Sequence, residues 1–175
     1  MRFAATLIAA LAVAVPLAHA QTPAAAPAAV PEAMPFDIPY GTPIALDTAN
    51  KAIAAAAAEA RKHNWKMSIT VVDPAGNLVA HATMDGTQYA SIPISQAKAR
   101  TAALFRRPSG VFQGAANGGS PNLLGLVALN GGVASEGGFP IVIDGKLVGA
   151  IGASGGIFTQ DAVTAKAGLA ALGVK

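Results

Sequence analysis

The sequence has no cysteine among its 175 residues. The protein therefore forms no disulfide bond, holds no metal ion through thiolates and has no cysteine nucleophile. The stability of the fold must come from the packing of side chains. The chain is long enough for this, because a domain of about 150 residues buries a sizeable core.

Aromatic and charged residues are also scarce, at 5% and 12% of the chain. Lys and Arg total 12 against nine Asp and Glu, so the formal net charge is only +3. Proteins that bind nucleic acids typically carry a clustered basic stripe with aromatic side chains beside it. This sequence offers no such stripe, and we expect no nucleic-acid partner.

Sequence motifs for common chemistries are missing as well. His63 and His81 have no partner at metal-ligand spacing, so no metal site is predicted. Residues 152–156 match the Gly-x-Ser-x-Gly pattern of a nucleophile elbow, but an α/β-hydrolase needs a histidine after the serine, and the last histidine here is His81. Neither the phosphate-binding Gly-Lys-Ser/Thr motif nor the dinucleotide motif Gly-x-Gly-x-x-Gly occurs. We predict no catalytic residue.

The N-terminal residues have the features of a secretory signal peptide. Arg2 precedes an apolar run, and Ala18-His19-Ala20 is a cleavage site of the A-x-A type. We therefore expect residues 1–20 to be removed and the protein to be periplasmic or secreted. Residues 21–43 form an Ala/Pro-rich linker, and residues 44–175 form the folded domain. No second long apolar run follows, so no integral membrane segment is expected after cleavage.

Hydrophobic periodicity predicts an α+β domain. Helices are expected at 48–63, 93–105 and 160–172, with a short helical turn at 111–116. Strands are expected at 67–72, 78–84, 123–128, 141–143 and 147–151. This order predicts a central antiparallel sheet of about five strands, covered by helices.

The stretch from Glu136 to Gly156 is the most informative part of the sequence. Asp144-Gly145 between two apolar runs predicts a hairpin with a type I′ turn. Glycines at 149 and 152 lie inside the second strand, which indicates that a helix, another backbone or a ligand approaches closely. Residues 137 and 138 are also glycines, and their N–H groups either bind an anion or belong to a tight bend.

Several motifs in this order resemble the GlcG/HbpS family, a heme-binding or heme-degrading domain. They are Val72-Asp73-x-x-Gly76-x-Leu78-Val79, Met84-Asp85-Gly86, Lys98-Ala99-x-Thr101-Ala102, Glu136-Gly137-Gly138-x-Pro140-Ile141, Gly145-x-x-Val148-Gly149-x-Ile151-Gly152-x-Ser154-Gly155-Gly156 and Asp161. The resemblance covers the chain from Leu46 to Val174. It implies a profilin-like α/β/α domain, often a dimer or larger assembly. One departure is Thr83, because relatives commonly carry arginine just before Met-Asp-Gly.

The resemblance implies that heme, or less commonly a corrinoid, binds near the Met-Asp-Gly and Gly-Gly-x-Pro segments. Residues with suitable chemistry for an axial bond to heme iron are His81, Met84 and Tyr89. The heme carboxylates would meet Lys98, Arg100, Arg106 or Arg107, although cations in this pattern more commonly belong to a solvated helix face. The expected cofactor-binding residues are Met84, Asp85, Lys98, Thr101, Glu136, Gly137, Gly138, Pro140 and His81.

Three functions are consistent with these residues. The first is an exported protein that binds a small molecule, heme above all, in a pocket between sheet and helix, and that works as a homo-oligomer. The second is an enzyme acting on heme or on a small carboxylate, for which Asp85 and Glu136 are the nearest acids. The third is an oligomeric scaffold without a ligand. The sequence leaves open whether the protein is an enzyme.

Overall fold

The computed structural model describes residues 30, 32–34, 36–119 and 121–174. The expected signal peptide, and residues 21–29, 31 and 35 of the expected linker, lie outside this part of the chain. Among the described helices, none combines the length and the apolar character needed to cross a bilayer.

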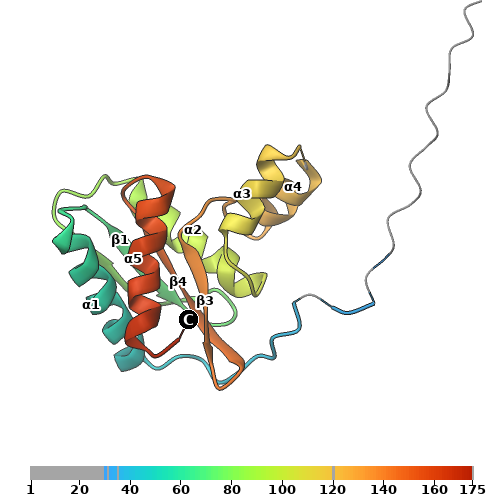
Figure 1. Ribbon diagram of the computed structural model, residues 1–175, viewed down its shortest axis with the longest axis horizontal. Helices are drawn as coiled ribbons and strands as arrows, with labels where there is room; N and C mark the ends of the chain where they lie inside the picture. Colours follow the sequence, from blue (N-terminus) through green and yellow to red (C-terminus); the bar gives the residue numbers. More distant parts are fainter. Residues whose placement is uncertain (1–29, 31, 35, 120, 175) are drawn as a thin grey trace, which may run out of the picture. The chain divides into compact units, whose positions relative to one another are not determined.

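One antiparallel sheet forms the centre of the domain (Figure 1). Its strands lie in the order β2-β1-β4-β3, so β2 and β3 are the two edges. The strands are β1 (Ser68–Val72), β2 (Leu78–Thr83), β3 (Gly138–Ile143) and β4 (Lys146–Ser154). The helices are α1 (Leu46–Lys62), α2 (Ser91–Leu104), α3 (Gly110–Asn117), α4 (Pro121–Leu129) and α5 (Phe158–Ala171).

The two faces of the sheet are covered by different helices. Helices α1 and α5 pack on one face, where Ile69, Val71 and Ile151 join the alanines of α1 in the larger core cluster. Helix α2 packs on the other face, where Val72 and Ala150 contact its small side chains. Figure 1 shows α1 and α5 in front of the sheet and α2 behind it. The domain is therefore layered α/β/α, and the expected α+β class is confirmed.

The small side chains of the expected central hairpin allow these layers to approach closely. Asp144 and Gly145 have φ values of 50° and 72°, which confirms the left-handed turn. Gly152 of β4 faces α2, and a Cβ atom there would lie 2.6 Å from the backbone nitrogen of Ala99. A glycine inside a strand was expected to mark the close approach of a helix, another backbone or a ligand. At Gly152 it is the helix α2 that approaches.

One expectation about strands was wrong, and the expected number of strands differs slightly from the observed one. The sheet has four strands rather than about five; in addition, Tyr40 forms a single isolated parallel bridge with Leu147. Residues 123–128 belong to helix α4 and not to a strand. Three of the six residues in this run are leucines, which favour helices, and Pro121 occupies the first helical position, which suits its fixed φ angle.

Candidate functional site

The strand register brings the Met-Asp-Gly and Gly-Gly segments to one end of the sheet. Ser68 at the start of β1 pairs with Thr83 at the end of β2 and with Ser154 at the end of β4. Gly138 at the start of β3 pairs with Gly152 of β4. The loops that leave these positions are 84–86, 155–156 and 136–137. We call this the glycine-rich end of the sheet.

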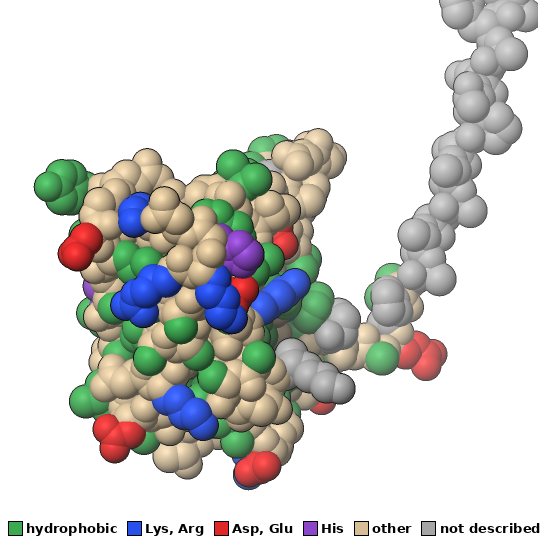
Figure 2. All heavy atoms as spheres, turned by 60° about the vertical axis from the view of Figure 1, so that its left-hand side comes forward, with side chains coloured by type: hydrophobic (Ala, Val, Ile, Leu, Met, Phe, Trp, Pro, Cys, Tyr) green, Lys and Arg blue, Asp and Glu red, His purple; other side chains and the backbone are tan. Residues whose placement is uncertain are grey.

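A cavity of about 400 Å³ lies at this end, beside the edge strand β2. We call it the α1–β2 cavity, since it is lined by Ala57, Arg61, Lys66, Ala82, Thr83, Met84 and Asp85. Met84 is half-buried and Asp85 is exposed. Two cations, one carboxylate, one hydroxyl, one thioether and two small apolar side chains therefore surround a single hollow. Figure 2, in which the α1 side of the molecule comes forward, shows Lys and Arg side chains gathered near the middle of that face.

A second hollow of about 340 Å³ lies next to the first. Lys66 lines both hollows, and the second one also contains Trp65, Gly155, Gly156 and Gln160. The Trp65 ring stacks on His63, with 4.3 Å between the ring centroids. Lys66 thus lies between two adjacent cavities at the glycine-rich end.

The expected ligand-binding residue Lys98 lies elsewhere, in the interior. Its Nζ atom donates a 2.6 Å hydrogen bond to Asp161 Oδ2, and both side chains are almost fully buried. Burial raises the pKa of Asp161, while Lys98 and the backbone N–H groups of Gly156 and Gly155 act in the opposite direction. A Cβ atom at Gly137 would lie 3.1 Å from Lys98 Nζ. The Lys98–Asp161 pair therefore links α2 to α5. Gly137 has no side chain, which leaves room for the ammonium group of Lys98.

The remaining residues of the Gly-Gly-x-Pro region also take part in internal packing. The N–H of Gly138 donates to Ser109 Oγ at 2.9 Å, so this group is already paired. Thr101 Oγ1 donates to the carbonyl of Ala97 at 2.8 Å and accepts from the N–H of Val133 at 2.8 Å.

Glu136 and Pro140 line two other cavities. Glu136 lies in a hollow next to α3, and Pro140 lies in one between β3 and α5. The residues expected in one pocket are therefore distributed over the interior and three separate cavities.

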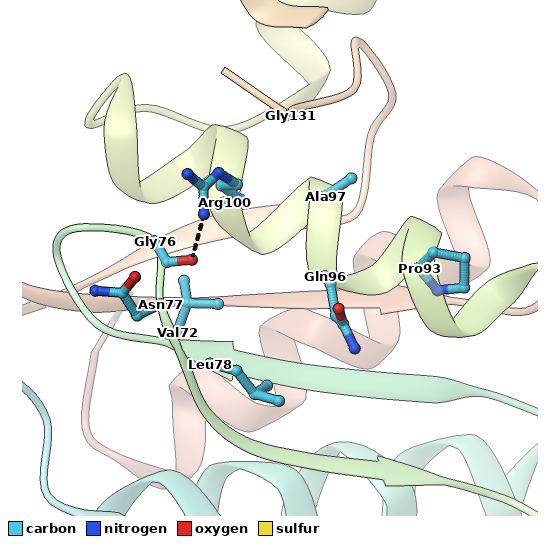
Figure 3. Close-up of a pocket in the computed structure, with 9 residues that line it drawn as sticks. All are labelled: Val72, Gly76, Asn77, Leu78, Pro93, Gln96, Ala97, Arg100 and Gly131. Carbon is cyan, nitrogen blue, oxygen red and sulfur yellow. Dashed lines mark hydrogen bonds between the residues drawn. The ribbon is translucent and has the colours of Figure 1, made fainter. Parts of the chain in front are cut away.

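The three arginines that were candidates for binding carboxylates contact the protein itself. Arg100 donates to the carbonyl oxygens of Asn130 and Gly76, at 2.7 and 3.1 Å, and Figure 3 shows it reaching Gly76 at the rim of a further cavity. Arg106 donates to the carbonyl of Ile38 at 2.9 Å. Arg107 lies 3.7 Å from the centre of the Phe36 ring.

Arg106 and Arg107 thereby attach the segment that leads into the domain. Arg106 also lies over the Tyr40 ring, at 5.4 Å, and Arg107 lies 4.7 Å from the centre of the Phe112 ring. The Nε atom of Arg107 is buried and has no hydrogen-bond partner. We call residues 36–40 with these two arginines the arginine clamp.

His81 belongs to a chain of hydroxyl groups between β1, β2 and α2. Ser95 Oγ donates to the carbonyl of Ile92, so the Thr70 hydroxyl, 2.8 Å away, donates to Ser95. Thr70 Oγ1 must then accept from His81 Nδ1, at 2.7 Å. This places the proton of neutral His81 on Nδ1 and leaves Nε2 as an acceptor, 2.8 Å from Thr83 Oγ1.

Burial lowers the pKa of His81 below 6.5, its ordinary value. The folded protein therefore binds fewer protons than the unfolded chain just below that pH, and its free energy of unfolding falls as the pH drops below about 6.5. We expect His81→Gln to flatten this slope in urea unfolding series measured between pH 5 and 8. His63→Gln removes the exposed histidine that lies 3.2 Å from Glu59 and serves for comparison. An unchanged slope in His81→Gln would show that His81 does not titrate in this way.

Sequence reasoning missed Arg61 and Lys66 as candidate site residues. Arg61 follows Ala57 by four residues and so lies on the same side of α1, next to the cavity. That spacing was available from the sequence. The position of β2 beside this part of α1 was not, because it depends on how helix and sheet pack.

The fold and its edge cavities define a small layered α+β domain, and comparison with known proteins gives its family. The family model described as "Haem degrading protein HbpS-like" matches residues 44–170. The chain therefore belongs to the HbpS-like family, as the sequence motifs indicated.

Relatives and solved structures agree with this assignment. Protein GlcG of Escherichia coli K12 is 43% identical over 106 residues, which cover 61% of this chain and 77% of GlcG. A double mutant of Streptomyces reticuli HbpS has a TM-score of 0.69 and 30% identity, with 83% of this chain and 99% of that chain covered. The structure of a PduOC:heme complex has a TM-score of 0.70, 24% identity and coverage of 77% and 98%; this likeness concerns the fold alone.

Proposed function

We propose that the protein binds heme in the α1–β2 cavity. The observation that carries the proposal is the composition of this cavity, in which Arg61, Lys66 and Met84 surround the small side chains Ala57 and Ala82. The choice of heme as the ligand is supported by the family description, which names heme degradation, and by the fold that this chain shares with a protein in complex with heme.

The lining residues fit the chemical groups of heme. Arg61 and Lys66 supply charge-assisted hydrogen bonds to carboxylates. The thioether of Met84 is a known type of axial ligand to heme iron. The alanines leave room for a flat apolar ring system to lie between helix and strand. When bound, heme supplies redox-active iron, and the protein supplies the binding and orienting groups.

The cavity also accounts for the departure at Thr83. The family resemblance implies an arginine at this position, and a threonine there supplies no cation at the end of β2. Arg61 from α1 and Lys66 from the α1–β1 connection bring positive charge to the same hollow. We propose that these two residues take over the pairing with an anionic ligand group in this protein.

Titration of hemin into the purified protein tests the proposal. We expect a Soret band shift at micromolar protein, and a loss of affinity of about tenfold or more in each of Arg61→Gln and Lys66→Gln, because hydrogen bonds to charged groups contribute about 1.5–3 kcal/mol. Met84→Leu should alter the spectrum of the bound heme by removing the sulfur. No Soret shift in the wild-type protein would contradict heme binding.

Matched variants separate these effects from general ones. Lys62→Gln changes a neighbouring cation that pairs with Glu59 and does not line the cavity. Met34→Leu changes an exposed methionine outside the cavity. Both should bind hemin like the wild type. If they weaken binding as much as Arg61→Gln and Met84→Leu do, heme does not occupy the α1–β2 cavity.

The family description favours heme degradation as a second candidate function. The heme-loaded protein can be incubated with a reductant in air to distinguish the two. Absorbance that persists would indicate binding alone, whereas progressive loss of the Soret band in the presence of the protein, and not with free heme, would indicate degradation.

We also propose that the protein is exported to the periplasm or the exterior. The proposal is supported by the charged, apolar and Ala-His-Ala segments of residues 1–20. The N-terminal sequence of the protein purified from its source tests this. A chain that begins at Gln21 is the expected result, and a chain that retains residues 2–20 would contradict it.

A further inference from the structure

The largest of the cavities described here lies at the edge of the sheet opposite to the α1–β2 cavity. Its volume is about 500 Å³, and it is formed where α5 crosses the edge strand β3. This size falls within the range of about 300–1,000 Å³ that is typical for small-molecule sites. We call it the β3–α5 cavity.

The lining of this cavity is apolar except at one position. Phe139 and Val142 come from β3, Leu169 and Ala170 from α5, and Ile38 from the arginine clamp. The one ionisable side chain among the lining residues is Lys166.

Lys166 is exposed, and its position next to the apolar lining suits a ligand-binding cation. Its Nζ lies 5.2 Å from the centre of the Phe139 ring, which holds the charge beside the apolar surface. None of the three ion pairs found between described residues includes Lys166. An apolar hollow with a single cation complements a molecule that has an apolar body and one negative charge.

The edge strand itself disfavours a protein occupant. A partner that added a strand to β3 would need the backbone N–H groups of this edge. Pro140, in the middle of the strand and in the wall of the cavity, has no N–H to donate. Proline on an edge strand is also a common device against pairing with another chain.

We propose that the β3–α5 cavity binds a small apolar carboxylic acid, with the hydrocarbon part against Phe139, Val142 and Leu169 and the carboxylate at Lys166. The proposal is independent of heme binding, because the two cavities lie at opposite edges of the sheet and share no lining residue.

Calorimetric titration with three probes of equal chain length tests this site: decanoate, decanol and decylammonium, each below its micelle-forming concentration. We expect decanoate to bind most tightly and decylammonium most weakly. Affinity for the acid should rise about fourfold for each methylene added from octanoate to decanoate, as burial of a methylene predicts.

Two variants and a control locate the binding. Lys166→Gln should lower the affinity for decanoate about tenfold, to the level of decanol, and leave decanol binding unchanged. Ala170→Phe, at an exposed helical position whose new side chain fills the hollow, should abolish binding of both. Lys146→Gln removes an exposed lysine of the β3–β4 hairpin and should change neither affinity.

The proposal is wrong if the wild-type protein binds none of the probes, or if it binds all three equally. It is also wrong if Ala170→Phe, with its thermal unfolding intact, binds decanoate as the wild type does. Hemin titration of Lys166→Gln should match the wild type. A loss of hemin affinity there would instead place heme in the β3–α5 cavity and overturn both assignments.

Discussion

Replacing Lys98 by methionine is expected to lower the free energy of unfolding by about 3–5 kcal/mol, as breaking a buried ion pair does. The side chains of Lys98 and Asp161 are exposed by only 1% and 2%. The variant leaves Asp161 as a buried carboxylate without its cation. Urea unfolding at pH 7, followed by circular dichroism, measures the loss.

The loss should depend on pH and on the partner residue. Because burial already raises the pKa of Asp161, removing the cation raises this pKa further, and the destabilisation should diminish as the pH falls and the carboxyl becomes protonated. Lys98→Met combined with Asp161→Leu removes both charges and should recover much of the stability.

A surface pair provides the control for this experiment. Lys62 and Glu59 are also 2.6 Å apart, but the Lys62 side chain is 68% exposed. Lys62→Met should therefore cause a much smaller loss, because exposed pairs contribute little. If Lys98→Met is no more harmful than Lys62→Met, the Lys98–Asp161 pair is not buried as described.

The second large effect is expected from Gly152→Ala. The new Cβ would overlap the carbonyl oxygen of Ser95 and lie 2.6 Å from the backbone nitrogen of Ala99. Both atoms belong to the backbone of α2, so no side-chain rotation relieves the overlap, and the helix must move away from the sheet. We expect a loss of about 3 kcal/mol, at the upper end of the usual range for overpacking.

Gly125→Ala is the matched control, since it makes the same chemical change where nothing lies within 4 Å of the new atom. Position 125 is inside α4, so the variant should gain up to about 1 kcal/mol from helix propensity. Thermal unfolding of the two variants should therefore shift in opposite directions. A Gly152→Ala protein as stable as the wild type would show that α2 does not rest on this glycine.

Local sequence patterns predicted the parts of the fold that depend on local chemistry. The turn at Asp144-Gly145 needs two left-handed residues, and few residue pairs allow it. In β2, the alternation of side chains along a strand places Ala80 and Ala82 toward α1 and His81 toward the hydroxyl groups of β1 and α2. The run at 123–128 failed because a short apolar segment does not distinguish a strand from a helix by periodicity alone.

The candidate site was harder to predict because it depends on distant contacts. Lys98 was expected to meet a carboxylate of the ligand, but the carboxylate that it meets in the structure is Asp161, which is 63 residues away in the sequence. Sequence alone cannot show that α2 and α5, on opposite faces of the sheet, meet beside Gly137. For the same reason Arg61 and Met84, on different elements, were not recognised as neighbours.

The arginine clamp bears on where the folding unit begins. The region matched by the family model starts at residue 44, beyond Phe36 and Tyr40. A chain that begins at residue 44 would lack Phe36, whose ring contacts Arg107. It would also lack Tyr40, which forms a β-bridge with Leu147. We therefore expect a chain that begins at residue 44 to be less stable than one that also contains residues 36–43, although these residues belong to the Ala/Pro-rich segment that the sequence alone presents as a linker.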